Sequence, residues 1–423
     1  MHIVVVGAGL IGSASAHHLA RRGHAVTLLE QAAAPASGAS HANGGMLTPS
    51  MADPWNAPGV WCNLLRWIGR TDAPMLLRPR ALPSLAGWGL RFIAASAPRR
   101  YRDNTLRNLR LAAYSVAGMA PLRATLALAY HAGTRGTLKL YSNPRALEAG
   151  ARLAGSLAPE HIEVLALDRQ QVLRLVPALA DAAERIAGGL HFPRDESGDA
   201  RLFTGQLCAA AARDGAELRF GCEVLGIESR AGTVRAVRTS HGTVAADAIV
   251  VAAGCHSAAL LRGLGPRLPI APVKGYSLTC SPPGGDATPA PIPLPLVDDA
   301  LHAALTPLGA SLRIAGTAEF AGFDTRLDPS RLENLRRLLR ALLPAHAARL
   351  LSGSVVPWAG LRPMSADGVP FIGAYGPRGL YVNAGHGHLG WTMADGSARL
   401  LADLIDGAEP ALDPSDYAPH RFA

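Results

Sequence analysis

Apolar and turn-forming residues follow one another in a strand–helix–strand order at the start of the chain. Residues 3–6 form a short apolar run that is typical of a buried strand. A glycine-rich turn follows at 7–12, and residues 13–22 are predicted as a helix that ends at Gly23. The apolar run 25–29 predicts a second strand, which leads directly into Glu30. We therefore expect a β–α–β unit here.

Similar patterns return in the middle and near the end of the chain. Further strands are predicted at 137–141, 217–220 and 243–251, the last as two short strands. Helical patterns cover 61–130, 202–213, 331–343 and 391–405. Segments rich in Gly, Pro, Ser or Asn predict loops at 35–60 and 282–295, the second of them exposed.

The segments between these α/β regions differ from them in composition, and no internal repeat is found. We predict an α/β protein with an α+β second domain. A Rossmann-like nucleotide-binding domain would be assembled from residues 1–50, 195–265 and 355–423. The second domain, inserted between these pieces, would comprise residues 51–194 and 266–354.

The chain is strongly basic, and the kind of basic residue changes what this means. The 423 residues include 41 Lys and Arg against 32 Asp and Glu, a net charge of +9. Only Lys139 and Lys274 are lysines, and the remaining 39 basic residues are arginines scattered through amphipathic segments. This distribution favours a solvated arginine-rich surface over a nucleic-acid site. A weak attraction to anionic lipid headgroups stays open.

Several protein classes are excluded by composition. Five cysteines in 423 residues are too few for a disulfide scaffold, and none has the spacing of a zinc site, so no metal is expected. No apolar run reaches the ~18 residues of a membrane span. The apolar N-terminus has no preceding positive charge, unlike a signal peptide. We expect a soluble cytoplasmic protein with reduced cysteines.

The glycine turn carries the first chemical signal. In the pattern Gly7-x-Gly9-x-x-Gly12, the first glycine permits a tight turn, the second lets phosphates approach the backbone, and the third allows close packing of helix and strand. A helix N-terminus attracts a pyrophosphate. Glu30 stands where an acid binds adenosine ribose hydroxyls, and its charge disfavours the 2′-phosphate of NADP.

Three later features favour FAD over NAD. The apolar strand within 247–254 runs into small residues that let a cofactor pass close to the backbone. A strand, a glycine turn and a helix start at 380–392 provide a second helix N-terminus, which suits the flavin edge that becomes anionic on reduction. The small-residue loop 37–45 can lie along a ribityl chain.

Several sequence blocks resemble the flavin-dependent D-amino-acid oxidase superfamily, which includes glycine and sarcosine oxidases. Within it, the chain is most similar to bacterial D-amino-acid dehydrogenases of the small-subunit type. The resemblance covers essentially the whole chain, and its most specific blocks are VVVGAGLIG at 4–12, PVKGYSLT at 272–279, AGTAEFAGFD at 315–324, WAGLRPMSADGVPFIG at 358–373 and NAGHGHLGWTMADGSARLLADLI at 383–405.

The resemblance implies a non-covalent FAD and an antiparallel-sheet substrate domain that roofs the flavin. The expected reaction oxidises the Cα–N bond of a free D-amino acid, or of a cyclic imino acid such as D-proline. The imine is then hydrolysed to a 2-oxo acid and ammonia. Electrons would pass to a quinone or another respiratory component, with peripheral contact at the cytoplasmic face of the inner membrane. Two alternatives stay open: an oxygen-using oxidase of glycine, sarcosine or proline, and a flavin enzyme acting on modified tRNA bases.

Motif and resemblance together propose a set of cofactor-binding residues. His41 resembles a flavin-adjacent histidine, but no covalent attachment is expected at His41 or at Cys255. Thr392 can donate to the flavin C2 carbonyl or simply cap its helix. The proposed residues are Gly7, Gly9, Gly12, Glu30, Gln31, Ser40, His41, Asn43, Gly44, Gly45, Val224, Ala253, Gly254, Gly387, His388, Leu389, Gly390 and Thr392.

Three residues are candidates for the reaction itself. Arg362 offers a planar fork for an α-carboxylate, the role of this arginine in the resembling family. The Tyr276 hydroxyl either touches the carboxylate or amine of the substrate, or lies in water on an amphipathic sheet. His386 lies near the flavin or the substrate, or is simply a hydrogen-bonded histidine. No general base is assigned, because an amine that arrives neutral needs none.

Three other polar residues have open roles. His388 stands where similar sequences carry a small residue, which suggests a difference in specificity. Glu319 either points into the pocket or is solvated, and the solvated state is favoured. Lys274 is expected to be an ion-pair partner.

Overall fold

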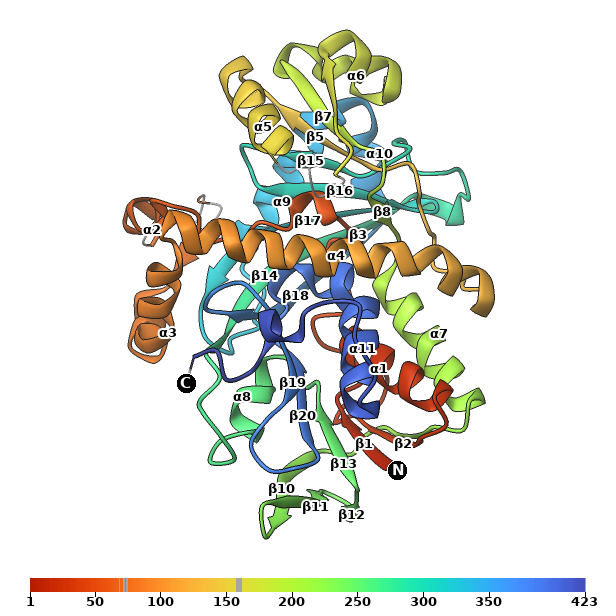
Figure 1. Cartoon of the computed structure of the whole chain (residues 1–423). Coiled ribbons are helices and arrows are strands. Elements are labelled where there is room, and N and C mark those ends of the chain that lie inside the picture. Colours follow the sequence, from red (N-terminus) through yellow and green to blue (C-terminus); the bar gives the residue numbers. More distant parts are fainter. Residues whose placement is uncertain (68, 71–72, 74, 157–161, 423) are drawn as a thin grey trace.

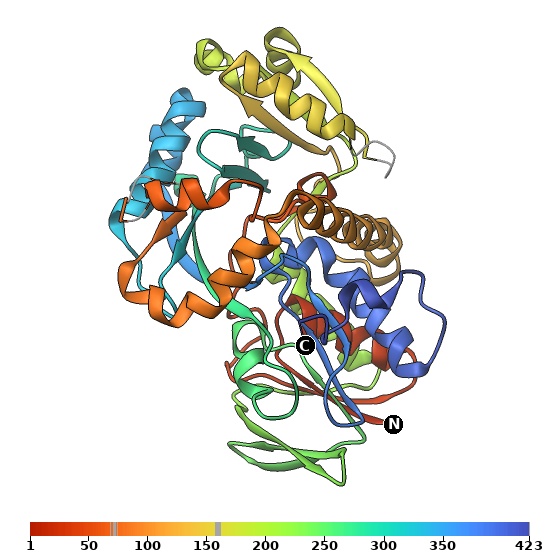
Figure 2. The ribbon, with the colours of Figure 1, turned by 60° about the vertical axis from the view of Figure 1, so that its left-hand side comes forward.

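Two large sheets organise the chain, which is described here by a computed structural model (Figure 1). The structure describes residues 1–67, 69–70, 73, 75–156 and 162–422. A six-stranded sheet and a nine-stranded sheet take up most of the strands. Figure 1 shows strands of the nine-stranded sheet in the upper part of the molecule and the six-stranded sheet in the lower part, and Figure 2 shows the same ribbon turned by 60°.

The six-stranded sheet is almost entirely parallel. Its strand order is β19-β20-β13-β1-β2-β9, and only the edge strand β19 runs antiparallel to its neighbour. All the parallel strands therefore end at the same edge, where ligands bind in open α/β sheets. The strands are β1 His2–Val6, β2 Ala25–Leu29, β9 Glu217–Arg219, β13 Ala248–Val251, β19 Phe371–Ala374 and β20 Leu380–Ala384.

Alternate residues of these strands enter two different cores, as the two-residue period of a strand requires. Ile3, Val5 and Val250 pack against helices on one face. Val4 and Ile249 face a three-stranded antiparallel sheet on the other. The helices are α1 Leu10–Arg21, α4 Pro98–Leu126, α7 Ala200–Arg213 and α11 Gly390–Asp406, and the small sheet contains β10 Val224–Arg230, β11 Thr233–Thr239 and β12 Gly242–Ala245.

The nine-stranded sheet is mostly antiparallel, in the order β18-β14-β17-β16-β15-β5-β7-β6, with β4 paired to β17. Helices α9 Pro329–Leu342 and α10 Pro344–Ser352 place leucines on its apolar side. Its strands are β4 Met75–Leu77, β5 Thr137–Tyr141, β6 Leu165–Asp168, β7 Gly188–Phe192, β14 Ile270–Ser281, β15 Leu296–Asp298, β16 Ala303–Leu308, β17 Ser311–Phe320 and β18 Ser354–Ser365.

Shorter elements connect and flank the sheets. Helices α2 and α3 stand together at one side of the molecule in both views (Figures 1 and 2). None of the described helices combines the length and apolarity needed to cross a bilayer. These remaining elements are α2 Val60–Trp67, α3 Leu82–Ala95, α5 Pro144–Ser156, α6 Arg169–Leu175 and α8 Ser257–Leu260, with β3 Met46–Leu47 paired to β8 Glu196–Ser197.

Most predicted elements are confirmed, with two substantial differences. The helical segment 61–130 is divided into α2, α3 and α4, interrupted by the strand β4, and residues 68, 71–72 and 74 of it lie outside the described part. The loop 282–295 is not exposed throughout, because Ile292 and Leu294 are buried in the core beneath the large sheet. Both differences arise from tertiary contacts that a local pattern does not encode.

The predicted domain boundaries stay a prediction, but two elements bear on them. Strand β18 pairs along its whole length with β14 in the nine-stranded sheet, although a boundary at residue 355 would assign most of it to the nucleotide-binding domain. Helix α4 belongs to the segment predicted for the second domain, yet it packs on α11 beside the six-stranded sheet.

Gly12 fixes how closely α1 approaches β1, and this gives a first prediction. A Cβ at Gly12 would overlap the carbonyl oxygen of Gly7. Gly12→Ala is therefore expected to lower the free energy of unfolding by about 1–3 kcal/mol or more. The matched control is Gly205→Ala in α7, where a Cβ meets nothing within 4 Å, and this should stabilise by about 0.5–1 kcal/mol. Urea unfolding of both variants measures the difference, and equal effects would contradict the packing argument.

Candidate active site

One cavity connects the six-stranded sheet to the nine-stranded sheet. Its volume is about 1440 Å³, above the ~300–1,000 Å³ usual for a pocket that holds one small ligand. It begins at the edge where the parallel strands end and continues beneath β14, β17 and β18. The proposed residues on its wall are Gly7, Gly9, Glu30, Gln31, Ser40, Asn43, Gly44, Val224, Ala253, Gly254, Tyr276, Arg362, His386, Gly387, His388 and Gly390. Gly12, His41, Gly45, Leu389 and Thr392 are not part of that wall.

The glycine turn brings strand β1, helix α1 and the end of β13 into close contact. Gly7 has φ +103°, and a Cβ there would lie 2.7 Å from the Ala252 oxygen. Gly9 is the N-cap of α1 and has no side chain to cap it. Ser40 partly takes that role, since its Oγ accepts from the Leu10 N–H at 3.0 Å. The first turn of α1 therefore opens into the cavity as an anion-binding helix end.

Glu30 is held in place by the backbone. Its Oε2 accepts from the Ala8 N–H at 2.8 Å, and its Oε1 accepts from the Ala32 N–H at 2.9 Å. A carboxylate has about four lone-pair sites, so two acceptor positions stay available toward the cavity. An oriented acidic acceptor beside a helix N-terminus suits the ribose of a dinucleotide.

The loop 37–45 is attached to the nine-stranded sheet. The Ser277 hydroxyl donates to the Ala42 carbonyl and the Thr306 hydroxyl to the Gly44 carbonyl, both at 2.7 Å. These bonds hold the loop as part of the cavity wall. The His41 ring instead packs against Trp358, with centroids 6.2 Å apart, and burial lowers its pKa.

Buried polar atoms without partners gather where α11 begins. Among the described residues, neither ring nitrogen of His386 has a hydrogen-bond partner, nor do Asn383 Oδ1 and Trp391 Nε1. All three residues line the cavity. Burial lowers the pKa of His386 to about 3, so its ring is neutral at neutral pH. Because buried polar groups are normally paired, these atoms fit a polar ring system bound here, as a flavin would provide.

Thr392 has a partner within the chain. Its Oγ1 accepts from the Thr48 N–H at 3.0 Å, and its side chain is buried. Thr392 therefore ties the segment after β3 to the start of α11. Contact of its hydroxyl with a flavin stays a prediction.

Arg362 is a cation of the cavity wall, which Lys139 and Arg262 also line. It lies on β18, and its Nη1 donates to the Thr317 carbonyl at 3.2 Å. Its guanidinium lies 5.5 Å from the Trp55 ring centroid, and no carboxylate of the described residues forms an ion pair with it. Burial lowers its pKa to about 10, so it is charged at neutral pH. A half-buried cation without a counter-ion favours binding of an anion.

Trp55 and His388 complete the wall beside Arg362. Their rings stack with centroids 5.0 Å apart, and His388 Nε2 lies 3.3 Å from the Met51 carbonyl oxygen. Burial lowers the pKa of His388 to about 4. Trp55 was not predicted from the sequence; the available signal was a large aromatic residue within a Gly- and Pro-rich loop.

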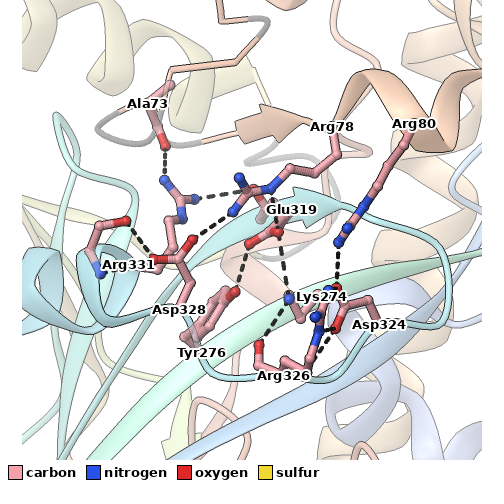
Figure 3. Close-up of polar contacts among 12 residues, drawn as sticks. Ala73, Arg78, Arg80, Lys274, Tyr276, Glu319, Asp324, Arg326, Asp328 and Arg331 are labelled. Carbon is pink, nitrogen blue, oxygen red and sulfur yellow. Dashed lines mark hydrogen bonds and ion pairs between the residues drawn. The ribbon is translucent and has the colours of Figure 1, made fainter.

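Next to the cavity, Glu319 lies in a buried cluster of charges (Figure 3). Tyr276 and Glu319 are each 1% exposed, and the tyrosine hydroxyl donates to Glu319 Oε2 at 2.6 Å. Arg78 Nε donates to Glu319 Oε1 at 2.8 Å, and Lys274 Nζ lies 3.5 Å from it. The expectation of a solvated Glu319 is therefore wrong, as is a Tyr276 hydroxyl in water. The expected ion pairing of Lys274 is confirmed.

The cluster compensates the buried carboxylate and fixes Tyr276. Arg331 is fully buried nearby and donates to the carbonyls of Ala73 and Ala318. Burial and the adjacent carboxylate raise the pKa of Tyr276, which keeps its proton on the bond to Glu319. Tyr276 pairs with Ala359 and Arg362 pairs with Val273, so the tyrosine side chain lies on the face of the sheet opposite to Arg362. Direct contact between Tyr276 and a substrate stays a prediction.

Cys255 also lines the cavity, near the proposed cofactor residues Ala253 and Gly254. Burial raises the pKa of its thiol to about 12, and a protonated thiol is a poor nucleophile. Over the described ranges, no group of three or more His, Cys, Asp or Glu side chains is placed to hold a metal ion.

Comparisons with known proteins agree with this arrangement. The family described as FAD dependent oxidoreductase matches residues 2–404. A D-amino acid dehydrogenase of Cereibacter sphaeroides is 42% identical, over 100% of this chain and 96% of that protein. One of Rhizobium johnstonii is 40% identical, over 100% of both.

Among solved structures, glycine oxidase from Geobacillus kaustophilus is similar with a TM-score of 0.77 and 26% identity, covering 99% of this chain and 98% of that one. L-proline dehydrogenase from P. horikoshii shares the fold, with a TM-score of 0.76 and 19% identity, covering 100% of this chain and 97% of that one. With its glycine turn, its oriented acidic residue and a family match over nearly its whole length, the chain belongs to the FAD-dependent oxidoreductase family.

Proposed function

We propose that this chain is a D-amino-acid dehydrogenase that oxidises the Cα–N bond of a free D-amino acid to an imine, which water converts to a 2-oxo acid and ammonia. The observation that carries the proposal is Arg362, a half-buried guanidinium without a carboxylate partner among the described residues, on the wall of the cavity. The names of relatives about 40% identical over the full chain support it. When bound, FAD supplies the ring that takes the hydride from Cα.

The chain's own residues would hold the cofactor non-covalently. Glu30 would accept the ribose hydroxyls, and the first turn of α1 would bind the pyrophosphate. The loop containing Asn43 and Gly44 would follow the ribityl chain. The turn at His386 and Gly387 would meet the ring, where the unpartnered buried atoms offer both donors and acceptors.

The substrate would be oriented by one charged contact and apolar walls. Arg362 would bind the α-carboxylate through its fork, with Trp55 supporting the guanidinium from one side. His386 and His388 have pKa values of about 3 and about 4, so both rings are neutral at neutral pH and neither is a suitable general base. The amine must therefore lose its excess proton to water before oxidation.

An oxygen-using oxidase is the second candidate. The structural similarity to a glycine oxidase at 26% identity favours it, whereas the names of the relatives with higher identity favour a dehydrogenase. Anaerobic bleaching of the flavin by D-alanine or D-proline, but not by the L-isomers, tests the reaction. Peroxide formation at the rate of dye reduction would identify oxygen as the acceptor.

We further propose that electrons leave to a quinone-type acceptor at an anionic membrane surface. Helix α3 exposes Leu82, Leu90 and Ile93, with Leu90 72% exposed. Residues 73–102 contain six arginines. Three of them have carboxylate partners elsewhere in the chain, so the charge offered to lipid headgroups comes from Arg91, Arg99 and Arg100. Apolar side chains combined with arginines suit the interface of an anionic bilayer. The adjoining segment lines the cavity with Trp55, Val60 and Trp67, and this supports a position of the proposed surface near the cavity.

Arg362→Ala tests the carboxylate assignment. Loss of a charge-assisted bidentate contact should raise the KM for D-alanine roughly 100-fold, while FAD content stays at one per chain. Arg362→Lys keeps a positive charge but lacks the planar fork, so its KM for D-alanine should lie between those of the wild type and Arg362→Ala. The control is Arg152→Ala, an exposed arginine whose nearest carboxylate contact is 3.9 Å. An unchanged KM in Arg362→Ala would remove the assignment.

The membrane surface is tested by vesicle sedimentation. The double variant Leu90→Glu, Ile93→Glu should reduce binding to phosphatidylglycerol vesicles about tenfold or more at low salt. The control Leu202→Glu alters a residue of α7 that is 44% exposed, as is Ile93. Binding of the wild type should weaken as salt rises and on phosphatidylcholine. If the wild type does not bind anionic vesicles, the surface has another role.

A further inference from the structure

Strand β17 contains an irregularity beside Arg362. Lys274 pairs with Glu319 and Tyr276 with Gly316, so β17 uses one residue more than β14 over the same stretch, which is a β-bulge. Within the bulge, Thr317 has φ +62°. A β-branched residue in this left-handed region is strained, and such residues cluster at functional sites.

The surrounding contacts hold Thr317 in this conformation. Two residues further on, Glu319 is fixed by Tyr276, Arg78 and Lys274, as Figure 3 shows. On the other side, the Thr317 carbonyl accepts from Arg362 Nη1 at 3.2 Å. Gly275 on β14 lets the guanidinium lie against the sheet, because a Cβ there would overlap it. The strain is therefore maintained by a buried network rather than by a flexible loop.

The strained backbone presents a hydroxyl that has no partner. Thr317 lines the cavity, and its Oγ1 is buried without a hydrogen bond to any described residue. An unpaired buried hydroxyl is costly unless a ligand completes it. Protein atoms cover this oxygen, so the side chain must turn about χ1 before the hydroxyl can reach a ligand beside Arg362, whose Nη1 binds the carbonyl of the same residue.

We propose that Thr317 is a substrate-binding residue whose hydroxyl donates to the carboxylate held by Arg362. The inference rests on the proposed function and extends it. A carboxylate can accept the two bonds of the arginine fork and a third from a hydroxyl. The bulge thus has a role in binding: it turns the carbonyl of Thr317 toward Arg362 and leaves the hydroxyl for the substrate. Thr317 would fix how the carboxylate, and with it Cα, is oriented.

Three variants separate the effect of the Thr317 hydroxyl on binding from the effect of the strained backbone. Thr317→Val keeps the β-branched shape but lacks the hydroxyl, Thr317→Ser keeps the hydroxyl, and Thr317→Gly lacks the hydroxyl but accepts a positive φ. The measurements on the FAD-loaded protein are flavin absorbance on titration with propionate, which has the carboxylate but no amine, and the KM and kcat for D-alanine. FAD content and melting temperature are recorded for each variant.

We expect Thr317→Val to weaken propionate binding and raise the D-alanine KM roughly tenfold or more, with a smaller effect on kcat. Thr317→Ser should stay within about threefold of the wild type. Thr317→Gly should bind as weakly as Thr317→Val but melt at a higher temperature, because glycine relieves the strain. A purely structural role would not separate binding from melting temperature in this way.

Several results would overturn the proposal. Wild-type propionate affinity in Thr317→Val would show that the hydroxyl does not contact the carboxylate. A loss confined to D-alanine would move the contact to the amine, and an equal loss in Thr317→Ser would make the role structural. If Thr317→Val fails to bind FAD, Thr317→Gly provides the same comparison. Failure of every D-amino acid to bleach the wild-type flavin would refute the proposed function, whereas propionate titration would still test Thr317.

Discussion

The structure depends on one electrostatic constraint: a half-buried guanidinium on the cavity wall with no carboxylate of the described residues to neutralise it. Arg362 keeps its charge at neutral pH even though burial lowers its pKa to about 10. A buried unpaired charge destabilises a fold unless something compensates it. Here the Thr317 carbonyl and the Trp55 ring compensate only in part. The free energy that remains is available to an anionic ligand, which supports the proposed binding of a carboxylate at Arg362.

The neighbouring charges show that the lack of a counter-ion is confined to Arg362. Glu319, buried on the next strand but one from β18, has cations around it in Arg78 and Lys274 as well as a hydroxyl donor in Tyr276. Lys274 pairs with both Glu319 and Leu361, whereas Arg362 pairs with Val273, so Glu319 and Arg362 lie on opposite faces of the sheet. Two adjacent regions of one sheet therefore differ. The charges around Glu319 are paired with one another, whereas the charge of Arg362 is open to the cavity. The paired region holds the strands that position the open one.

How much could be predicted from the sequence depends on the range of the interaction. The turn at Gly7, Gly9 and Gly12 with Glu30 is local, because the same short β–α–β segment supplies both the conformation and the chemistry. The role of Arg362 was inferred from resemblance rather than from spacing. The burial of Glu319 was missed because it depends on cations from β14 and from the segment after β4, far away in the sequence. The positive φ of Thr317 depends on the register between two long strands, which a single strand pattern does not reveal.

The histidines of the cavity complete the electrostatic picture. His386 and His388 both lie near the carboxylate-binding wall, and if protonated they would add positive charge and attract anions without specifying their orientation. Burial lowers their pKa values to about 3 and about 4, so both rings stay neutral throughout the physiological range. Of Arg362, His386 and His388, only Arg362 is then charged. One fixed cation with a planar fork defines an orientation, whereas a diffuse positive region would not, and the oxidation of Cα requires an orientation.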